Sequence, residues 1–381
     1  MISVSTVNDA LKSFYLDVLI NQLNSSISPL YSRLKATEAH ISGKEAVKPV
    51  CYDLSSGIAA LSEYGDLPEA NGNNYVNLRA DLKNLYGTIE ITDKAMRASE
   101  NNQGAVVNLL NAEMEGLLAT AKQNFSRMLY GNGSGCIAKI TAGVSASAQV
   151  EVDNTKYIKV GFPVDVVASG VATTTRVVAI DGKTVTLANA VTASEGDIIT
   201  LAGSYNNEIF GIETIFTNPA TLYGVSTEGK AWMKPYINDG VGEISDIKIQ
   251  TAIDAAEEAS GGKIDFITCS YGVRRAYQEY LEKTKRNINP VELEGGFKTI
   301  SYAGIPVVAD RFCGEGNMYV LDTKLFEMHQ LCDWRWLEGE SGNVLKQLAN
   351  KAAYKATLVK YANLICSLPC GQAKLSGIVE K

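Results

Sequence analysis

The side chains best suited to chemistry in this chain are its two histidines, His40 and His329, and its seven cysteines. His329 and Cys332 are spaced as H-x-x-C, and Cys366 and Cys370 as C-x-x-x-C, so both pairs offer ligands that zinc accepts. Both pairs nevertheless lie in apolar, strand-like stretches, where free cysteine usually behaves as a small buried hydrophobic side chain. We therefore expect buried thiols here and no metal site.

Two glycine-containing segments are close to nucleotide-binding motifs. Gly182-Lys183-Thr184 matches the end of a phosphate-binding loop, but Val177 stands where that loop needs its first glycine. Residues 131–135 read Gly-Asn-Gly-Ser-Gly, and Cys136 replaces the third glycine of the dinucleotide fingerprint. The first segment is expected in a hairpin turn and the second at the end of a helix, which is not where either motif works. The sequence thus predicts no catalytic residue and no cofactor, and hence a protein that is not an enzyme.

Composition narrows the class of protein further. The 381 residues are 46% hydrophobic and 20% charged, as in ordinary folded proteins, and the net charge of −7 is spread along the chain. A dedicated nucleic-acid binder would carry clustered lysine and arginine, which this sequence lacks. The N-terminus has no secretory pattern, and no uncharged apolar run approaches the roughly 20 residues that span a bilayer. Together with an odd, scattered set of cysteines, these features indicate synthesis in a reducing cytoplasm.

The first part of the chain is expected to form a helix and an arm. Val7, Leu11 and Phe14 recur at helical spacing, which predicts a helix over residues 6–23. Residues 24–47 are polar, weakly periodic and interrupted by a proline. We interpret them as an extended or partly helical arm that needs another surface to hold it.

Two strands with a long connection come next. Residues 48–54 are predicted as a short strand, and alternation through 78–91 predicts a longer one with a bulge near Gly87. The connection, residues 55–77, is rich in glycine and asparagine but too apolar for a plain linker. We expect it to be the tip of a projecting hairpin whose apolar side chains contact another molecule. These candidate assembly residues are Ile58, Leu61, Tyr64, Leu67 and Tyr75.

A strong helical pattern follows, and after it the pattern of residues changes to one typical of β structure. Apolar residues from Val106 to Met128 step by four or three, which predicts a helix over 105–130, about 39 Å long, closed by the glycines and asparagine of 131–133. Residues 136–203 contain short Val/Thr/Ile runs separated by glycine, as in a small all-β module. Within this module, Asp181-Gly182 suits the two-residue turn of a hairpin.

From residue 206 onward the pattern alternates between helix and strand. Trp334 and Trp336 lie at strand spacing, which puts both rings on one face, where packing is the expected role. Helices are predicted over 247–259 and 271–285, strands over 264–269, 305–309 and 318–321, and a long closing strand over 354–366.

The order of these parts resembles the major capsid protein of tailed bacteriophages, which has the HK97-type fold. Residues 65–68 (Gly-Asp-Leu-Pro) and 72–75 (Gly-Asn-Asn-Tyr) are similar to the extended loop of that family. Further similar segments are 82–94, the strand entering the spine helix; 207–213, the return from it; 304–308, a strand of the axial domain; and 354–369, the closing strand of the peripheral domain. The resemblance covers nearly the whole chain.

The resemblance implies an α+β fold with parts in a fixed order. Residues 1–47 would form the N-terminal helix and arm, 48–92 the extended-loop hairpin, and 93–135 the spine helix of the peripheral domain. Residues 136–204 would form an inserted β domain, 205–345 the axial domain with return strands of the peripheral domain, and 346–381 the closing strand of the peripheral domain.

The implied function is self-assembly into an icosahedral shell of pentamers and hexamers that encloses double-stranded DNA. Such a protein resides in the virion and is assembled in the cytoplasm of the host bacterium. The implied partners are further copies of the chain, a separate scaffolding protein and a portal, with a decoration protein as a further candidate. The DNA would be held without sequence specificity, and no membrane is involved.

Two departures from the family limit what is carried over. Some members join subunits through an isopeptide bond from a loop lysine, but residues 55–77 contain no lysine, so no such cross-link is expected. Some members carry an N-terminal scaffolding segment, which here would be absent or already cleaved, since the first predicted helix begins at Thr6. The nearest alternative is an encapsulin-like nanocompartment that encloses protein cargo. An enzyme with an unrecognised site and a β-rich surface adhesin are more distant alternatives.

Overall fold

The computed structural model describes residues 28–53, 57–69, 72–94, 103–284, 290–292, 298–338 and 344–381. The helix predicted over residues 6–23 lies outside them. The chain forms two compact units, one made of Met1–Ser126 with Ile215–Lys381 and the other of Arg127–Thr214. No helix in the described part of the chain is long and apolar enough to cross a membrane.

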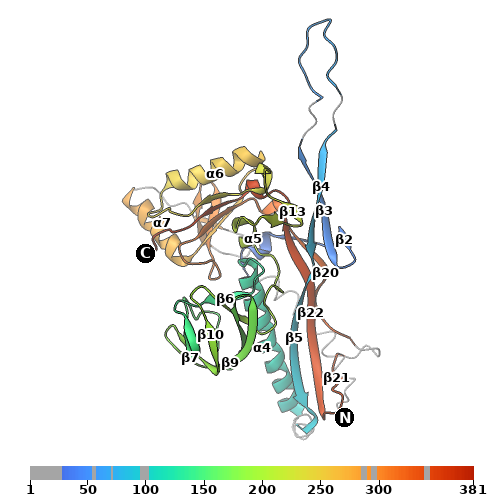
Figure 1. Cartoon of the computed structure of the whole chain (residues 1–381), viewed down its shortest axis with the longest axis vertical. Coiled ribbons are helices and arrows are strands. Elements are labelled where there is room, and N and C mark those ends of the chain that lie inside the picture. The colour runs from blue at the N-terminus through green and yellow to red at the C-terminus, as the bar shows by residue number, and fades with distance from the viewer. Residues whose placement is uncertain are drawn as a thin grey trace. The chain divides into compact units, whose positions relative to one another are not determined.

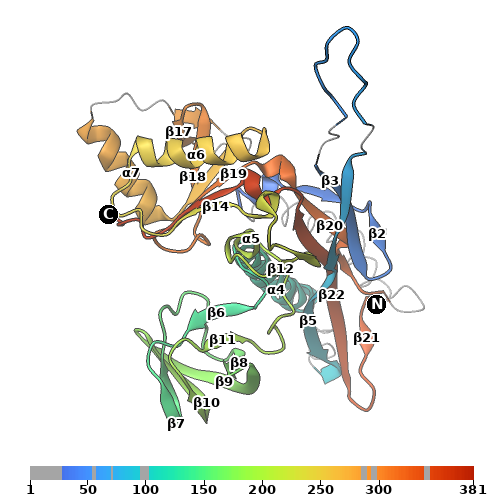
Figure 2. The same cartoon turned by 45° about the horizontal axis from the view of Figure 1, so that its top comes forward.

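A five-stranded sheet with one long helix forms part of the first unit. Its strands are β1 (Lys35–Thr37), β20 (Phe326–Trp336), β22 (Ala353–Cys366), β21 (Lys346–Gln347) and β5 (Lys83–Thr92), with β5 and β22 side by side in Figures 1 and 2. The helix is α4 (Gln103–Leu129), which confirms the predicted spine-like helix. Its buried face includes Phe125, whose ring lies 6.1 Å from that of Trp334 on β20. Trp334 and Trp336 are both buried, as their strand spacing predicts.

The bulge predicted near Gly87 is wrong. The pairing of β5 with β22 continues without a shift, and Gly87 lies directly opposite Leu358. A Cβ atom at this position would lie 2.9 Å from Cδ1 of Leu117 on α4, so a larger residue would require the Leu117 side chain to shift. The break in the long predicted strand comes earlier, at Leu82, and it separates β4 (Asn74–Asp81) from β5.

The polar arm packs on its own subunit over the described residues 28–47. Leu30, Tyr31 and Leu34 are buried, and the Tyr31 ring lies 5.3 Å from that of Phe125 in an edge-to-face contact. The segment contains η1 (Tyr31–Arg33) and β2 (Ile41–Ser42), while β1 runs parallel to β20. The sequence predicts a segment that another surface must hold, and over the described residues β20 and α4 of the same chain provide that surface.

A seven-stranded sheet covered by helices α6 (Asp246–Ser260) and α7 (Tyr271–Lys283) forms another part of the first unit. The sheet order is β14 (Tyr236–Asn238), β23 (Ala373–Leu375), β19 (Met318–Leu321), β15 (Phe266–Cys269), β18 (Ile305–Ala309), β17 (Lys298–Tyr302) and β16 (Pro290–Glu292). Helix α6 ends at Gly261, whose φ of 68° is the left-handed conformation that glycine favours at this position. Helix α7 begins after Ser270, whose side chain accepts the N–H of Val273.

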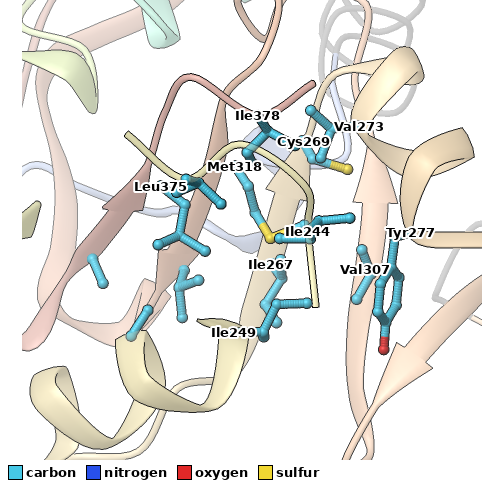
Figure 3. Close-up of a cluster of buried hydrophobic side chains, with 14 of the residues drawn as sticks. Ile244, Ile249, Ile267, Cys269, Val273, Tyr277, Val307, Met318, Leu375 and Ile378 are labelled. Carbon is cyan, nitrogen blue, oxygen red and sulfur yellow. The ribbon is translucent and has the colours of Figure 1, made fainter. Parts of the chain in front are cut away.

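Apolar side chains from both helices meet those of this sheet in one core. Ile249 of α6, Val273 of α7 and Ile267 of β15 are fully buried together (Figure 3). The core includes Leu375 of β23, although the sequence reading put all of residues 346–381 in the closing peripheral strand. That assignment needs correction, because residues 373–375 pair with β19 and β14 in the seven-stranded sheet.

A three-stranded sheet has the order β2, β3 (Glu45–Asp53) and β4, and β2 pairs with only the first two residues of β3. The remaining short elements are α5 (Glu213–Phe216), β12 (Thr221–Leu222), β13 (Val225–Ser226), η2 (Ala231–Met233), η3 (Thr323–Leu325) and η4 (Pro369–Gly371).

The second unit is a closed six-stranded barrel, which confirms the predicted all-β module. Its strands run in the order β6 (Cys136–Lys139), β11 (Ile198–Leu201), β8 (Pro163–Ala168), β9 (Val171–Asp181), β10 (Thr184–Ala193) and β7 (Val144–Glu151). A bridge between Ile140 and Val152 joins the first strand to the last. The barrel has its own core, in which Val164, Val185 and Ile199 are fully buried.

Two predicted turns of the second unit differ in detail from the structure. Asp181 faces Thr184, so the central residues of the hairpin turn are Gly182 and Lys183, one position later than predicted. Only Gly182 has a positive φ, 58°, as in a type II′ turn. The end of α4 lacks the predicted glycine cap at once after the helix, because the first positive φ comes at Gly133.

Candidate assembly surface

The histidines and cysteines that the sequence offers as candidates for chemistry have structural roles in the fold. In the described part of the chain no group of three or more His, Cys, Asp or Glu side chains could hold a metal ion. Cys366 is fully buried and Cys370 nearly so, and burial raises the pKa of the Cys366 thiol to about 12. A thiol with that pKa stays protonated at neutral pH and is a poor nucleophile. His329 is also buried, with Nδ1 3.2 Å from the Ala39 carbonyl oxygen, and it does not meet Cys332 in a metal site.

One buried charged side chain, that of Lys360, was not predicted from the sequence. The Lys360 ammonium of β22 lies 2.6 Å from Oδ1 of Asp333 and 2.9 Å from Oε1 of Gln330, and 5.4 Å from the centre of the Phe125 ring. Burial lowers the pKa of Lys360, against the opposing effect of the Asp333 carboxylate. The only signal in the sequence is a lysine within an apolar strand. Because the lysine side chain is fully buried, its role is to join β22, β20 and α4 from inside.

A two-stranded ribbon carries the loop that the sequence singled out. Strands β3 and β4 pair antiparallel from Glu45↔Asp81 to Asp53↔Asn74. Figure 1 shows the connection between them (blue) continuing beyond both strands. The described residues 57–69 of this connection form no helix or strand. An isolated two-stranded hairpin is only marginally stable in water, so the base of the ribbon needs support from the rest of the unit.

That support comes from three contacts between the ribbon and other elements of the first unit. Lys48 of β3 forms an ion pair of 2.9 Å with Glu327 of β20. The backbone N–H of Arg79 donates to the Tyr223 carbonyl oxygen over 2.9 Å. The ring of Tyr52 stacks on that of Trp232 with 5.5 Å between centroids and 17° between planes. The ribbon is therefore held by a charge pair and a backbone bond along its strands and by an aromatic stack at the loop end of β3.

The loop leaves its apolar side chains in solvent. Ile58, Tyr64 and Leu67 are 89%, 94% and 87% exposed, and Leu61 and Tyr75 are exposed as well. Fully burying one such side chain is worth about 1.5–3 kcal/mol, so the free subunit forgoes a considerable stabilisation along this short segment. Exposed apolar sets of this kind are typical of interaction surfaces, so these residues remain the candidates for assembly contacts.

Other exposed apolar side chains, which the sequence reading did not name, are more scattered. Ile247 is exposed at the start of α6, Tyr86 on β5, and Val160, Val171 and Val178 on the barrel. Single exposed apolar residues are common on soluble proteins and need no special role. Within the described residues, the loop is where several of them follow one another closely along the chain.

The comparisons with known proteins identify the fold. No family model and no curated protein matches this chain. The capsid asymmetric unit of Cyanophage A-1(L) is 10% identical, covers 94% of this chain and 92% of its own, and has a TM-score of 0.57. The capsid of an empty GTA particle is 10% identical, with coverage of 94% and 90% and a TM-score of 0.50. The encapsulin of the holo-SrpI complex from Synechococcus elongatus PCC 7942 is 11% identical over 95% of each chain, but its TM-score of 0.46 is too low to support an argument. The chain thus has an α+β fold of the HK97-like capsid type.

Proposed function

We propose that this chain is the major capsid protein of a tailed bacteriophage, which assembles from pentamers and hexamers into an icosahedral shell around double-stranded DNA. The observation that carries the proposal is the loop of residues 57–69, which leaves Ile58, Tyr64 and Leu67 almost fully exposed on a fold found in capsids. A subunit that functioned alone would gain nothing from this exposure. A subunit in a shell can bury the same side chains against a neighbour.

The proposed mechanism of assembly is packing without covalent linkage. Contacts between different surfaces of successive copies close into rings, as pentamers and hexamers require. The loop contributes Ile58, Leu61, Tyr64 and Leu67, and Tyr75 at the start of β4 continues the same apolar series. Residues 55–77 contain no lysine, so the loop cannot provide the amine of an isopeptide bond.

The proposed cargo is DNA held in bulk. The net charge of −7 without a basic cluster suits a wall that confines DNA rather than a surface that binds it tightly. A separate scaffolding protein and a portal belong to the same proposal, with a decoration protein as a further candidate partner. The corresponding location is the virion, after assembly in the host bacterial cytoplasm.

Electron microscopy of the purified full chain, with analysis of particle contents, tests this function. Closed shells or rings containing DNA, when the chain is produced with its phage proteins, are the expected result. Shells that contain enzymes and no DNA would instead indicate an encapsulin-like compartment. Monomers under all conditions, including added scaffolding protein and high salt, would refute assembly altogether.

A further inference from the structure

The direction of each backbone N–H in the ribbon follows from bonds near its base. Leu82 N donates to Lys44 O over 2.9 Å, so these facing residues form a hydrogen-bonded pair of the ladder. Facing pairs alternate along an antiparallel ladder, so Val47 and Arg79 form a pair whose N–H groups point away from the ribbon. Both groups do so. The N–H of Val47 donates to the carbonyl oxygen of His40, between β1 and β2, and the N–H of Arg79 donates to the carbonyl oxygen of Tyr223.

The same alternation identifies the outward groups farther along the ribbon. Pro49 faces Asn77, and Cys51 faces Tyr75, so all four residues direct their backbone polar groups outward. On β4, Asn77 and Tyr75 each present an N–H and a carbonyl oxygen, and neither forms a hydrogen bond with any described residue. On β3, Pro49 has no N–H to present.

The two edges of the ribbon therefore differ in what they offer a further strand. An added strand on β4 would find donors at Asn77 and Tyr75, in step with Arg79, whose N–H is already bonded within the subunit. An added strand on β3 would meet Pro49 first, and proline on an edge strand is a known protection against pairing. Beyond Cys51 the register of β3 shifts, which interrupts the regular spacing again.

We propose that the outer edge of β4 binds an extended segment of a second copy of this chain by strand addition, and that Pro49 excludes the outer edge of β3 from this contact. The choice of a second copy rests on the proposed function. It is supported by the apolar loop that extends from the same two strands, since a neighbour that covers Tyr64 and Leu67 also passes the ribbon. In strand addition, main-chain hydrogen bonds provide affinity and the adjacent side chains provide specificity.

A pair of substitutions at one residue separates the backbone contact from the side chain. Asn77→Pro removes the outward N–H, whereas Asn77→Ala removes the side chain and keeps the N–H. Because this N–H does not bond to β3, both variants should fold with the melting temperature of the natural protein. We expect Asn77→Pro to raise the protein concentration needed for shell formation about tenfold or more, and Asn77→Ala to leave it within about twofold, since tenfold corresponds to 1.4 kcal/mol.

The matched control lies on the opposite edge of the ribbon. Cys51→Pro removes the outward N–H of β3 at the residue that faces Tyr75, and it should assemble as the natural chain does. Equal assembly of Asn77→Pro and Cys51→Pro would overturn the proposal. If Asn77→Pro failed to fold, amide hydrogen exchange of the natural chain decides instead. Asn77 and Tyr75 should exchange at least about tenfold more slowly in shells than in free subunits, and protection of Cys51 alone would contradict the proposal.

These results are separate from the test of the proposed function. If the natural chain forms no shells, the proposed function fails and the ribbon edge has no neighbour to bind. If the natural chain forms shells and the amides of Asn77 and Tyr75 stay as exposed as in the free subunit, only the strand-addition proposal fails.

Discussion

The barrel of Arg127–Thr214 and the ribbon of β3 and β4 differ in whether their strand edges are paired and their apolar side chains buried. The barrel closes on itself through Ile140 and Val152 and buries its apolar side chains in its own core. In the ribbon, β2 pairs with the start of β3, no described strand pairs with the outer edge of β4, and the apolar side chains of the loop face solvent. Closure removes the free edges that would otherwise pair with other chains. The barrel is therefore complete within one subunit, whereas we propose that a neighbour completes the ribbon.

Removing the loop should have the largest effect. Deletion of residues 56–74, with a two-residue turn in their place, should abolish shell formation and leave a folded subunit, because the base of the ribbon keeps its contacts with Glu327 and Tyr223. Sedimentation velocity and circular dichroism measure the two outcomes.

The control for this deletion is excision of the barrel by joining Gly135 to Ser204. These residues are adjacent, since a Cβ atom on Gly135 would lie 2.5 Å from the Ser204 carbonyl oxygen. We expect the first unit to fold without residues 136–203. The assignment of assembly to the ribbon is wrong if the loop-deleted chain folds and still forms shells, or if the barrel-less chain folds and no longer forms them.

Substitutions that remove only apolar side chains make the comparison sharper. Replacing Ile58, Tyr64 and Leu67 together by serine should raise the assembly concentration more than a hundredfold, because each side chain contributes about 1.5–3 kcal/mol if a neighbour buries it. The subunit's melting temperature should not change, since the three side chains are exposed in it.

The matched control for the triple variant lies on the barrel. Val160, Val171 and Val178 are also exposed, and their joint replacement by serine should leave assembly unchanged. Light scattering against protein concentration measures both variants. An equal loss of assembly in the two triple variants would show that exposed apolar area in general, rather than the loop, drives association.

A cavity in the barrel should act on stability and not on assembly. Ile199→Ala removes a fully buried side chain from the barrel core and should cost about 2–5 kcal/mol of the barrel's free energy of unfolding. Ile58→Ala, in the loop, should cost nothing measurable in the free subunit. Urea denaturation followed by hydrogen exchange of barrel amides checks this. A destabilisation that spread equally to the amides of the seven-stranded sheet would contradict an independent barrel.

The smallest expected effect is the pH dependence of the free energy of unfolding that arises from His329. Burial lowers the pKa of His329, outweighing its bond to the Ala39 carbonyl and the charge of Glu327. The unfolded chain, with a histidine pKa near 6.5, therefore binds a proton before the folded chain does, so stability falls as pH drops below about 6.5. His329→Gln should reduce this loss, measured as the urea midpoint between pH 7.5 and 5.5.

His40→Asn is the control for the pH experiment. His40 is exposed and has a φ of 63°, a conformation that asparagine tolerates. Because the charge of His40 contributes to lowering the pKa of His329, this variant should change the pH dependence of stability less than His329→Gln does. A larger change in this variant than in His329→Gln would place the titrating group elsewhere.

How far the sequence predicts the structure depends on whether a pattern is local. Helices α6 and α7 and strands β18 and β19 were predictable because their apolar spacing and end signals lie within the segments themselves. The close packing at Gly87 was not, because the side chain that it faces, Leu117, lies 30 residues away on another element. Strand β23 has three residues and is a strand because it pairs with β19, and no local pattern predicts that pairing.

The same distinction applies to the candidate assembly surface. The exposure of Ile58, Tyr64 and Leu67 was predictable, because an apolar segment without a period has no core to face. The surface that holds the arm was not predictable, because Leu30, Tyr31 and Leu34 are few and their partners, such as Phe125, come much later in the chain. The roles of the loop residues in assembly stay predictions until shells are studied.

The most direct test of the central claim is hydroxyl-radical labelling of Tyr64 in free subunits and in assembled particles. Tyr64 is 94% exposed in the subunit, so it should be labelled readily there, and its labelling should drop about tenfold or more in shells. Tyr157 of the barrel, which is half-buried within its own unit, serves as the internal reference and should be labelled equally in both states. Equal labelling of Tyr64 in free subunits and in closed shells would contradict the claim that a neighbouring copy completes the ribbon.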